Sequence, residues 1–297
     1  FLLFFSTITY SQDYALKLDG IDDFAQMDGV INFNDEITID LEFEYYDDTD
    51  GIIIGKMIHG TDCSFYIGMN PSNNDGFGRV RWGFKTEAMG TLDSDLYFDT
   101  PESLNQNQRY RLTATYNGSD LKVYIDNTLS FEATIEPNLD GPIAQTNHPI
   151  VIGKKYNYME EDSPAYFDGL VDNVRIWNKS LDIDDLENNN QFIVLDWRFN
   201  QSGSTNNGLL YDSSCECYNG NIYGAELEYI GPLYGCNDDF AENYNSNASI
   251  NDGSCQYPNN GDQILSFDGV DDSVVLDGSI LQDYPITITA DIYIDSL

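Results

Sequence analysis

Three carboxylates alternate with apolar residues in one short stretch of the chain. Asp40, Glu42 and Glu44 are separated by Leu41 and Phe43, and on a β-strand they would therefore share one face. Retaining glycosidases use two carboxyl groups about 5 to 5.5 Å apart, which neighbours i and i+2 on a strand can roughly supply. The stretch is either an acid/base pair for glycoside hydrolysis or a solvated strand face.

A second acidic motif occurs twice in the chain. The run Asp-Gly-Ile-Asp-Asp at 19–23 returns as Asp-Gly-Val-Asp-Asp at 268–272. Its apolar neighbours survive only as a class, as Leu18 and Phe267 show, which is typical of core positions. The aspartates, in contrast, are identical in the two copies. They form either an acidic turn, in which Gly takes a left-handed conformation and Asp caps backbone amides, or a set of calcium ligands, because crowded carboxylates repel one another unless a cation or solvent lies between them.

The repeat also bears on the hydrolase alternative. In the second copy the three-acid face becomes Thr289, Asp291 and Tyr293, so two of the three acids are absent. His59 and His148 are the only histidines, and no Ser/His/Asp or Cys/His arrangement accompanies them. We therefore expect no enzyme. We also expect that Asn or Gln in place of the three acids would leave function intact and would, if anything, relieve repulsion.

The composition is that of an acidic globular protein. The chain has 51 acidic and 13 basic residues, for a formal net charge of -38, so nucleic acid and anionic membrane surfaces would repel it. Because 41% of the residues are hydrophobic and only 22% are charged, there is enough apolar material for a core. Beyond the first residues, no stretch approaches the ~20 apolar residues that cross a bilayer. We expect neither nucleic-acid binding nor membrane insertion.

The first residues and the cysteines indicate an oxidising compartment. Residues 1–12 are apolar and then small and polar, as at the end of a secretory signal peptide, with a first β-strand as the alternative. Cys236 and Cys255 bracket a polar segment that burial alone could not hold together, and a disulfide closing a loop of about 20 residues would contribute on the order of 3 kcal/mol. Cys63 is expected to be a buried thiol. The expected location is secreted or at the cell surface, and the pairing of Cys63 and of the two cysteines of the Cys-x-Cys sequence stays open. Those two are Cys215 and Cys217.

Short β-strands must position these side chains. Residues 16–190 alternate between apolar and polar positions, and Asn, Gly, Asp and Pro separate the alternating runs. Asn117 and Gly118 form a hairpin signal, and only residues 182–189 are typical of a helix. The pattern predicts an all-β sandwich or jelly roll. Strands are expected at 37–44, 51–55, 64–69, 79–84, 110–116, 121–126, 129–135, 150–153 and 167–177.

Three motifs give this pattern a family resemblance. The acidic run at 19–23, the strand pair at 115–126 and the closing strand at 167–178 resemble laminin G-like, concanavalin A-like jelly roll domains and occur in the family's order. The resemblance covers residues 13–192. It implies two curved antiparallel sheets, adjacent first and last strands, often a bound calcium ion, and binding of glycans or proteins without catalysis.

The resemblance implies a metal site and weakens the hydrolase alternative. Asp19, Asp22 and Asp172 are expected to hold calcium where the opening turn meets the closing strand, since the family topology places those two strands side by side. The acids at 40–44 resemble the laminarinase-type motif, but in the wrong order, because Asp comes first where that family has Glu.

Other segments suggest a modular protein. The spacing of the two acidic runs exceeds the repeat of about 20 to 50 residues found in solenoids, so it indicates a repeated domain, and we expect the chain to be a fragment of a longer protein. The expected organisation is a signal peptide remnant at 1–12, a jelly roll at 13–192, a flanking strand and turn segment at 193–234, a Cys-bounded spacer at 235–257 and the start of a second jelly roll at 262–297. The flanking segment and the spacer are similar to parts of secreted multidomain proteins of Bacteroidetes.

One long loop is a candidate for ligand binding. Residues 154–164 lie between two expected strands and carry Tyr156, Tyr158, Glu160 and Asp162. Tyrosines can stack on sugar rings, and acids can bind a cation or sugar hydroxyls. The alternative is an exposed hairpin tip without a ligand.

The sequence therefore favours a noncatalytic, secreted or cell-surface recognition module that binds extracellular glycans or cell-surface proteins with the help of calcium. A structural spacer of a larger extracellular protein is the second hypothesis. A laminarinase-like glycoside hydrolase is the third.

Overall fold

A computed structural model describes most of the chain and divides it into two units. The described residues are 13–47, 51–58, 62–70, 78–90, 96–155, 165–200, 208–214 and 216–257, together with 267, 270, 273 and 274. The first unit ends at Gly231 and the second begins at Pro232. Each unit is described by itself.

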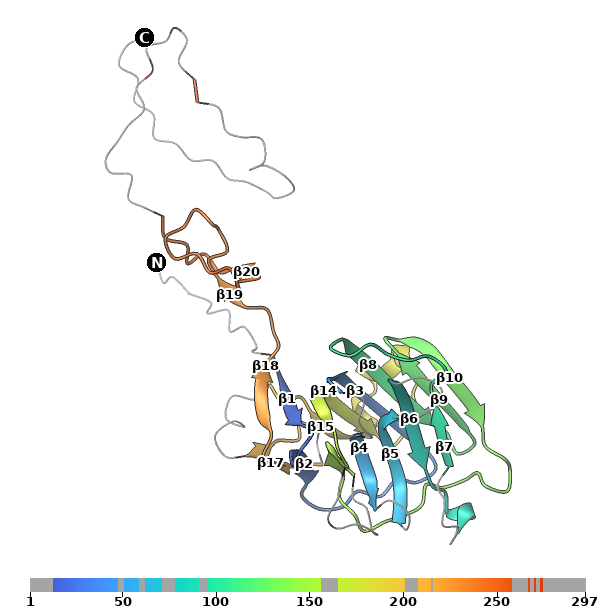
Figure 1. Ribbon diagram of the computed structural model, residues 1–297. Coiled ribbons are helices and arrows are strands. Elements are labelled where there is room, and N and C mark those ends of the chain that lie inside the picture. Colours follow the sequence, from blue (N-terminus) through green and yellow to red (C-terminus); the bar gives the residue numbers. More distant parts are fainter. Residues whose placement is uncertain are drawn as a thin grey trace, which may run out of the picture. The chain divides into compact units, whose positions relative to one another are not determined.

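The first unit is a sandwich of two antiparallel sheets of eight strands each (Figure 1). Sheet A has the order β10-β9-β8-β3-β14-β1-β18, and β15 also pairs with β14. Sheet B has the order β16-β17-β2-β11-β4-β5-β6-β7. This arrangement confirms the predicted all-β jelly roll.

The strands have the following bounds. Sheet A contains β1 (Tyr14–Asp19), β3 (Ile37–Tyr45), β8 (Arg109–Tyr116), β9 (Asp120–Ile125), β10 (Thr128–Thr134), β14 (Asp168–Trp177), β15 (Ile193–Trp197) and β18 (Glu226–Tyr229). Sheet B contains β2 (Phe24–Met27), β4 (Ile52–Ile58), β5 (Asp62–Asn70), β6 (Arg79–Phe84), β7 (Leu96–Asp99), β11 (Val151–Ile152), β16 (Leu209–Leu210) and β17 (Gly220–Tyr223). A small hairpin joins β12 (Lys154–Lys155) and β13 (Ala165–Tyr166).

One apolar core lies between the two sheets. In β8, for example, Leu112, Ala114 and Tyr116 point into it and are fully buried, while the residues between them face outward, as the period of a strand requires. Trp82 is also buried in this core, which confirms the position expected from its strand pattern. Trp177 is fully buried as well, but it pairs with Thr38 and lies beside Arg175 on the outer face of sheet A.

The segment that follows the jelly roll of the sequence prediction is built into both sheets. β15 pairs with β14, β18 pairs with β1, and β17 pairs with β2. Trp197 of β15 is fully buried, and its indole N–H donates a hydrogen bond of 3.1 Å to the carbonyl oxygen of Tyr218. Residues 193–231 thus supply strands and core side chains to the sandwich itself.

The register of β14 with its two neighbours determines which acidic side chains lie opposite one another in sheet A. β14 lies between β1 and β3, so the expected adjacency of the first and closing strands is confirmed. Asp19 pairs with Asp168, and a bulge between Asp172 and Arg175 interrupts the ladder to β3. Asn173 lies in this bulge with a φ of 50°, a left-handed conformation that Asn tolerates better than most residues.

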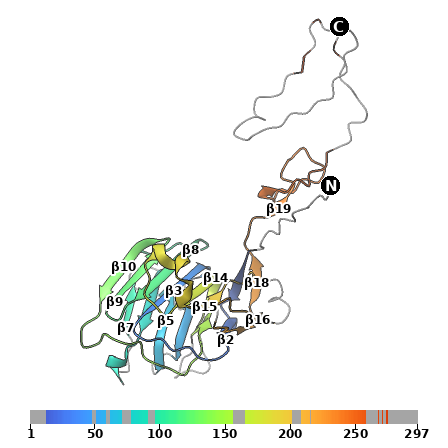
Figure 2. The same ribbon diagram turned by 180° about the vertical axis from the view of Figure 1, so that it is seen from behind.

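Helical structure among the described residues is confined to short 3-10 turns. These are η1 (Glu87–Met89), η2 (Ile183–Asn188) and η3 (Asn190–Phe192), and η2 matches the one segment in which the sequence predicted a helix. η2 lies over the outer face of sheet A, where Glu187 forms an ion pair of 3.0 Å with Arg175 (Figure 2). Within the described part of the chain, no helix is long and apolar enough to span a membrane.

The second unit contains a short module closed by a disulfide. Cys236 and Cys255 are bonded to one another, which confirms the predicted pairing. Two strands of two residues each, β19 (Tyr234–Gly235) and β20 (Ile250–Asn251), pair in parallel in this unit. Cys63 is buried in the first unit, as predicted, and Cys215 is outside the described residues.

Candidate functional site

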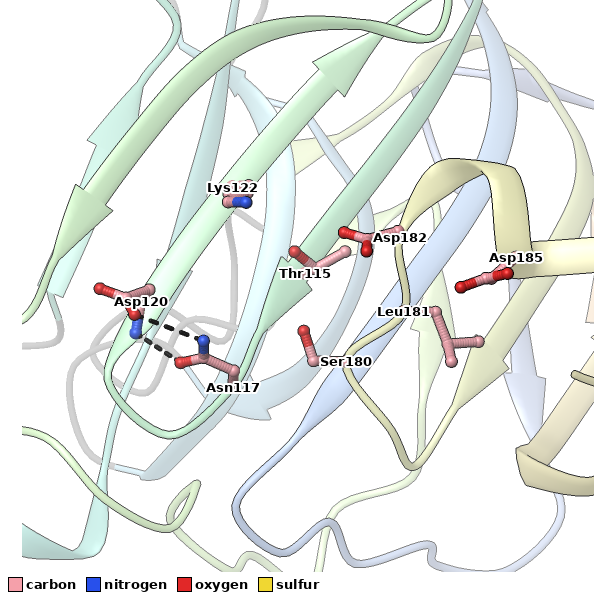
Figure 3. A pocket seen from close by; sticks show the side chains of 8 residues that line it. All are labelled: Thr115, Asn117, Asp120, Lys122, Ser180, Leu181, Asp182 and Asp185. Atoms are coloured by element: carbon pink, nitrogen blue, oxygen red, sulfur yellow. Dashed lines mark hydrogen bonds between the residues drawn. The ribbon is translucent and has the colours of Figure 1, made fainter.

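A cavity of about 190 Å³ opens on the outer face of sheet A (Figure 3). Two of its walls are the neighbouring strands β8 and β9, and the third is the segment that leads from β14 into η2. The residues that line it are Thr115, Asn117, Asp120, Lys122, Ser180, Leu181, Asp182 and Asp185. We call this cavity the sheet A pocket.

The third wall is held in place by hydrogen bonds to β3 and the residue before it. The backbone N–H of Leu181 donates to the Thr38 hydroxyl at 2.9 Å, and that hydroxyl donates to the carbonyl oxygen of Lys179 at 2.7 Å. The N–H of Ser180 donates to the Glu36 carboxylate at 2.9 Å. Because Thr38 lies on β3, next to β8, these contacts fix the distance across the pocket.

Asn117 and Asp120 stabilise the β8–β9 hairpin at one end of the pocket. The Asn117 side-chain oxygen accepts hydrogen bonds from the N–H groups of Ser119 at 3.0 Å and Asp120 at 2.7 Å. Asp120 accepts a hydrogen bond of 2.6 Å from the Thr134 hydroxyl. This bond, followed by the Asn117 amide, lowers the pKa of Asp120, which therefore stays ionised. The predicted hairpin at Asn117 and Gly118 is confirmed.

Other polar side chains of the pocket have no such partners. Thr115 is only 5% exposed, yet within the part of the chain that the structure describes its hydroxyl makes no hydrogen bond. The same holds for the Lys122 ammonium group and the Asp182 carboxylate. Figure 3 shows Thr115 between Lys122 and Asp182. The Thr115 oxygen is not among the fully buried side-chain atoms that lack a partner, so it reaches the cavity, where water or a ligand can supply the hydrogen bond that a polar group normally makes.

The donors and acceptors of the pocket suit a ligand with many hydroxyl groups. Hydroxyls can both donate and accept, an ammonium group donates, and carboxylates accept. The sequence analysis did not identify these residues as a site. The sequence shows one face of a strand in the alternation of Arg109, Arg111, Thr113 and Thr115, but nothing in it indicates that this face borders a pocket.

The acidic turn between β1 and β2 brings three carboxylates together. One carboxylate oxygen from each of Asp19, Asp22 and Asp23 lies within 4.8 Å of the others. Asp19 also caps the turn, because its Oδ1 accepts the N–H groups of Ile21 at 2.9 Å and Asp22 at 3.3 Å. Gly20 has a φ of 72°, so the left-handed turn of the first alternative is present.

The same three oxygens fit a calcium ion. Ligands at about 2.3 to 2.6 Å from a common ion lie at most about 5 Å from one another, which the turn satisfies. Burial and then the Asp19 charge raise the pKa of Asp23, and burial raises that of Asp168, the β14 partner of Asp19. Such a crowd of acids would gain from a cation. If calcium is bound, Asp19, Asp22 and Asp23 would hold it.

Asp172 does not join this group, contrary to the sequence prediction. The register pairs Asp19 with Asp168, so Asp172 lies four residues further along β14. Its buried carboxylate instead forms an ion pair with Arg109 of β8 and accepts the N–H of Asn173 at 2.7 Å. The family resemblance implied which strands are neighbours but not their register.

Burial and charge give Asp172 a testable pH dependence. Desolvation raises its pKa to about 7, although Arg109 acts in the opposite direction, whereas an unfolded Asp titrates near 4. Between about pH 4 and pH 7 the native state holds a proton that the unfolded state has lost, so the contribution of Asp172 to stability is fully present below about pH 4 and is lost as pH rises through 7. In urea titrations, the unfolding free energy should lose about 2.5 kcal/mol more between pH 5 and pH 8.5 than that of Asp172→Asn. Equal pH slopes in the two proteins would contradict this.

The three-acid face of β3 is not a solvated surface. Asp40 is 2% exposed, and its carboxylate binds Arg111 at 2.9 Å and Arg175 at 2.8 Å. It also accepts a hydrogen bond of 2.7 Å from the Thr113 hydroxyl. Glu42 pairs with Arg109 at 2.7 Å. The expectation that these acids are exposed and repel one another is therefore wrong for Asp40, because arginines from β8 and β14 surround it.

The candidate ligand loop lies mostly outside the described residues. Tyr156, Tyr158, Glu160 and Asp162 belong to the undescribed stretch 156–164. The described bases of the loop are the strands β12 and β13.

Comparisons with known proteins agree with this architecture. A family model of the concanavalin A-like lectin/glucanases superfamily matches residues 19–186. A search of curated proteins finds no significant match.

Solved structures are similar to this chain at low sequence identity. A protein from Bacteroides ovatus ATCC 8483, described as a candidate carbohydrate-binding protein, is 14% identical with a TM-score of 0.57, and the match covers 74% of this chain and 61% of that protein. A SAP-like pentraxin from Limulus polyphemus is 14% identical with a TM-score of 0.44, over 58% of this chain and 79% of the pentraxin. Domains LG4-5 of the mouse laminin α1 chain are 17% identical with a TM-score of 0.40, over 58% of this chain and 44% of theirs.

The chain thus spans less than two thirds of the Bacteroides ovatus protein, and these likenesses concern the fold. The family model is different in kind, because it matches more than half of the chain. The protein belongs to the concanavalin A-like lectin/glucanases superfamily.

Proposed function

We propose that the first unit is a noncatalytic recognition module for extracellular glycans, and that it binds a sugar in the sheet A pocket. The observation that carries this proposal is the hydroxyl of Thr115, which opens into a cavity lined by further donors and acceptors and makes no hydrogen bond to the residues that the structure describes. Families of this fold include many carbohydrate binders, and the Bacteroides ovatus protein is described as a candidate one. Fold analogy alone would not suffice.

The charge of the pocket favours a neutral glycan. Asp120, Asp182 and Asp185 outnumber the one cation, Lys122, and the chain as a whole carries a formal net charge of -38. Uronic acids and sulfated sugars would be repelled. The hydroxyls of neutral sugars can donate to these carboxylates and accept from Lys122.

Noncatalysis rests on the ion pairs of the acids that the sequence offered as a catalytic pair. A glycosidase needs one carboxylic acid that donates a proton and a second carboxylate that acts as nucleophile or base. Asp40 and Glu42 both form ion pairs with arginines, so neither carboxyl group is free to act on a substrate. The disulfide, together with the signal peptide remnant expected at residues 1–12, suits an extracellular site of action.

A glycan panel with matched variants tests the proposal. The full chain, Thr115→Val and Lys122→Ala would be assayed on neutral and anionic oligosaccharides, with Lys17→Ala as the control because Lys17 is an exposed lysine on the same sheet. We expect a neutral oligosaccharide to bind the full chain and Lys17→Ala equally, and both pocket variants about tenfold or more weakly, because each removes a polar contact. If no oligosaccharide binds the full chain, the proposal fails and the spacer hypothesis gains.

We further propose that calcium binds the acidic turn and stabilises the sandwich. An ion that binds only the native state would add about 2.7 kcal/mol at ~100 times its dissociation constant. EDTA should therefore lower the melting temperature of the chain, and Asp22→Asn should abolish the difference. Asp184→Asn, which changes an exposed acid of η2, should keep it. A melting temperature that EDTA leaves unchanged would show that the site is not there.

A further inference from the structure

Four side chains form a ladder on the outer face of sheet B. Phe24 of β2 and Tyr223 of β17 are a cross-strand pair, and their rings are stacked with centroids 4.5 Å apart and planes 13° apart. The ammonium group of Lys154 lies 4.3 Å from the centroid of the Phe24 ring and 5.5 Å from that of the Tyr166 ring. We call these four residues the aromatic ladder.

The ladder lies next to the acidic turn. Asp23 immediately precedes Phe24, and Gly224 immediately follows Tyr223. A Cβ on Gly224 would come within 2.1 Å of the Asp23 carboxylate, and Gly224 has a φ of 76°, so only glycine allows β17 to approach the turn so closely. The charge of Asp22 also helps to raise the pKa of Tyr166, after burial. Aromatic rings and carboxylates thus share one surface.

The exposure of the ladder suits a ligand better than a core. Tyr223 is 42% exposed, whereas Phe24, Lys154 and Tyr166 are half-buried. Stacked rings can be stabilising in a sheet without any ligand, but a stack that ends in an open tyrosine offers a flat apolar face to the solvent. At least one face of a sugar ring carries mainly C–H groups, and its hydroxyls project from the edge. Such a ring can cover an aromatic face and direct its hydroxyls to nearby carboxylates and an ammonium group.

We infer that the aromatic ladder is a second glycan-binding site, in which Tyr223 stacks on a ring of a neutral polysaccharide whose hydroxyls reach Asp22, Asp23 and Lys154. This inference rests on the proposed function. The carboxylates of the turn exclude anionic sugars for the same reason as in the sheet A pocket. The two sites lie on different sheets, because the pocket is on the outer face of sheet A. One module would therefore bind two stretches of polysaccharide, which raises avidity without new contacts.

The experiment removes the first site before it examines the second. Neutral oligosaccharides of glucose, xylose, mannose and arabinose would be titrated calorimetrically into the full chain and into Thr115→Val/Lys122→Ala. In that double variant, residual binding should be weakened about tenfold or more by Tyr223→Ala and kept by Tyr223→Phe, which preserves the ring.

Tyr97→Ala, in the same background, is the matched control. Tyr97 is 55% exposed on β7, at the opposite edge of sheet B, and the guanidinium carbon of Arg81 lies 4.1 Å from its ring centroid. Its loss should leave binding unchanged.

Each other outcome overturns the inference in a recognisable way. If the full chain binds an oligosaccharide but the double variant binds none, the ladder is not a site and the pocket remains. If Tyr223→Ala and Tyr97→Ala weaken binding equally, or neither does, the ladder is not the second site. If the full chain binds nothing, the proposed function fails together with the inference. Thermal melts of each variant show whether a lost signal reflects unfolding.

Discussion

A chain that ends at residue 192 is expected not to fold. It would contain every motif of the family resemblance but would lack β15, β16, β17 and β18, which belong to both sheets. The loss exposes the edges of β1, β2 and part of β14 and removes four core side chains. These are Leu195, Trp197, Phe199 and Leu210, each at most 2% exposed.

The expected size of this effect follows from the core residues alone. Deleting one large buried side chain costs about 2 to 5 kcal/mol, and a whole domain is stable by only about 5 to 15 kcal/mol. Four such losses amount to about 8 to 20 kcal/mol, which is as large as that margin. Circular dichroism and thermal melts of residues 13–192 should show no cooperative transition, whereas residues 13–231 should melt cooperatively. A cooperative melt of the shorter chain would mean that the sandwich is stable without β15 to β18.

Replacing Asp40 by Ala is expected to cost about 3 to 5 kcal/mol, the range for breaking a buried ion pair from one side. The change leaves Arg175, which is 13% exposed, and Arg111 without their shared carboxylate. Thr113 loses its acceptor as well. Because the remaining charges cannot easily reach water, their desolvation is no longer offset. This contradicts the sequence-based expectation that the acid could be removed freely.

Glu44→Gln is the matched control on the same face of the same strand. Glu44 is half-buried and has no ion pair among the described residues, so its change should lie within about 0.5 kcal/mol. Urea unfolding of the two variants and the unmodified chain measures the difference. An unfolding free energy of Asp40→Ala equal to that of Glu44→Gln would show that the arginines relax into solvent.

The pattern of apolar and polar residues predicted the fold because it encodes the two faces of each strand. The alternation along Ile37, Ile39 and Leu41 gives a buried face whatever the neighbours are. The Asn-Gly turn likewise predicts its hairpin from local backbone preference alone. The disulfide could be predicted because Cys236 and Cys255 lie close in sequence within a segment that has little core of its own.

The site could not be predicted in the same way, because it depends on the register of paired strands and on which segments cover the outer face of the sheet. Adjacent strands β1 and β14 were expected, but which residue faces Asp19 depends on where the pairing starts, and the answer is Asp168. Asp40 looked exposed because nothing local shows that η2 and two distant arginines cover it. The pocket joins Thr115 to residues 180–185, far away in the chain. The alternation along Leu195, Trp197 and Phe199 indicates a strand, but nothing local shows that it pairs with β14 in the sandwich.

The pairing of β1 with β18 determines how the module would respond to mechanical tension. The N–H groups of Ile230 and Gly231 donate to the carbonyl oxygen of Asp13, at 2.9 and 3.3 Å, so the polypeptide enters and leaves the sandwich at one point. A force applied to both of these ends loads the antiparallel ladder one hydrogen bond at a time, which is peeling rather than shear. β18 would detach first and β17 next, and Tyr223 would leave the aromatic ladder with it. Stretching would then release a polysaccharide from the aromatic ladder, while the sheet A pocket, on β8 and β9, would still bind its ligand.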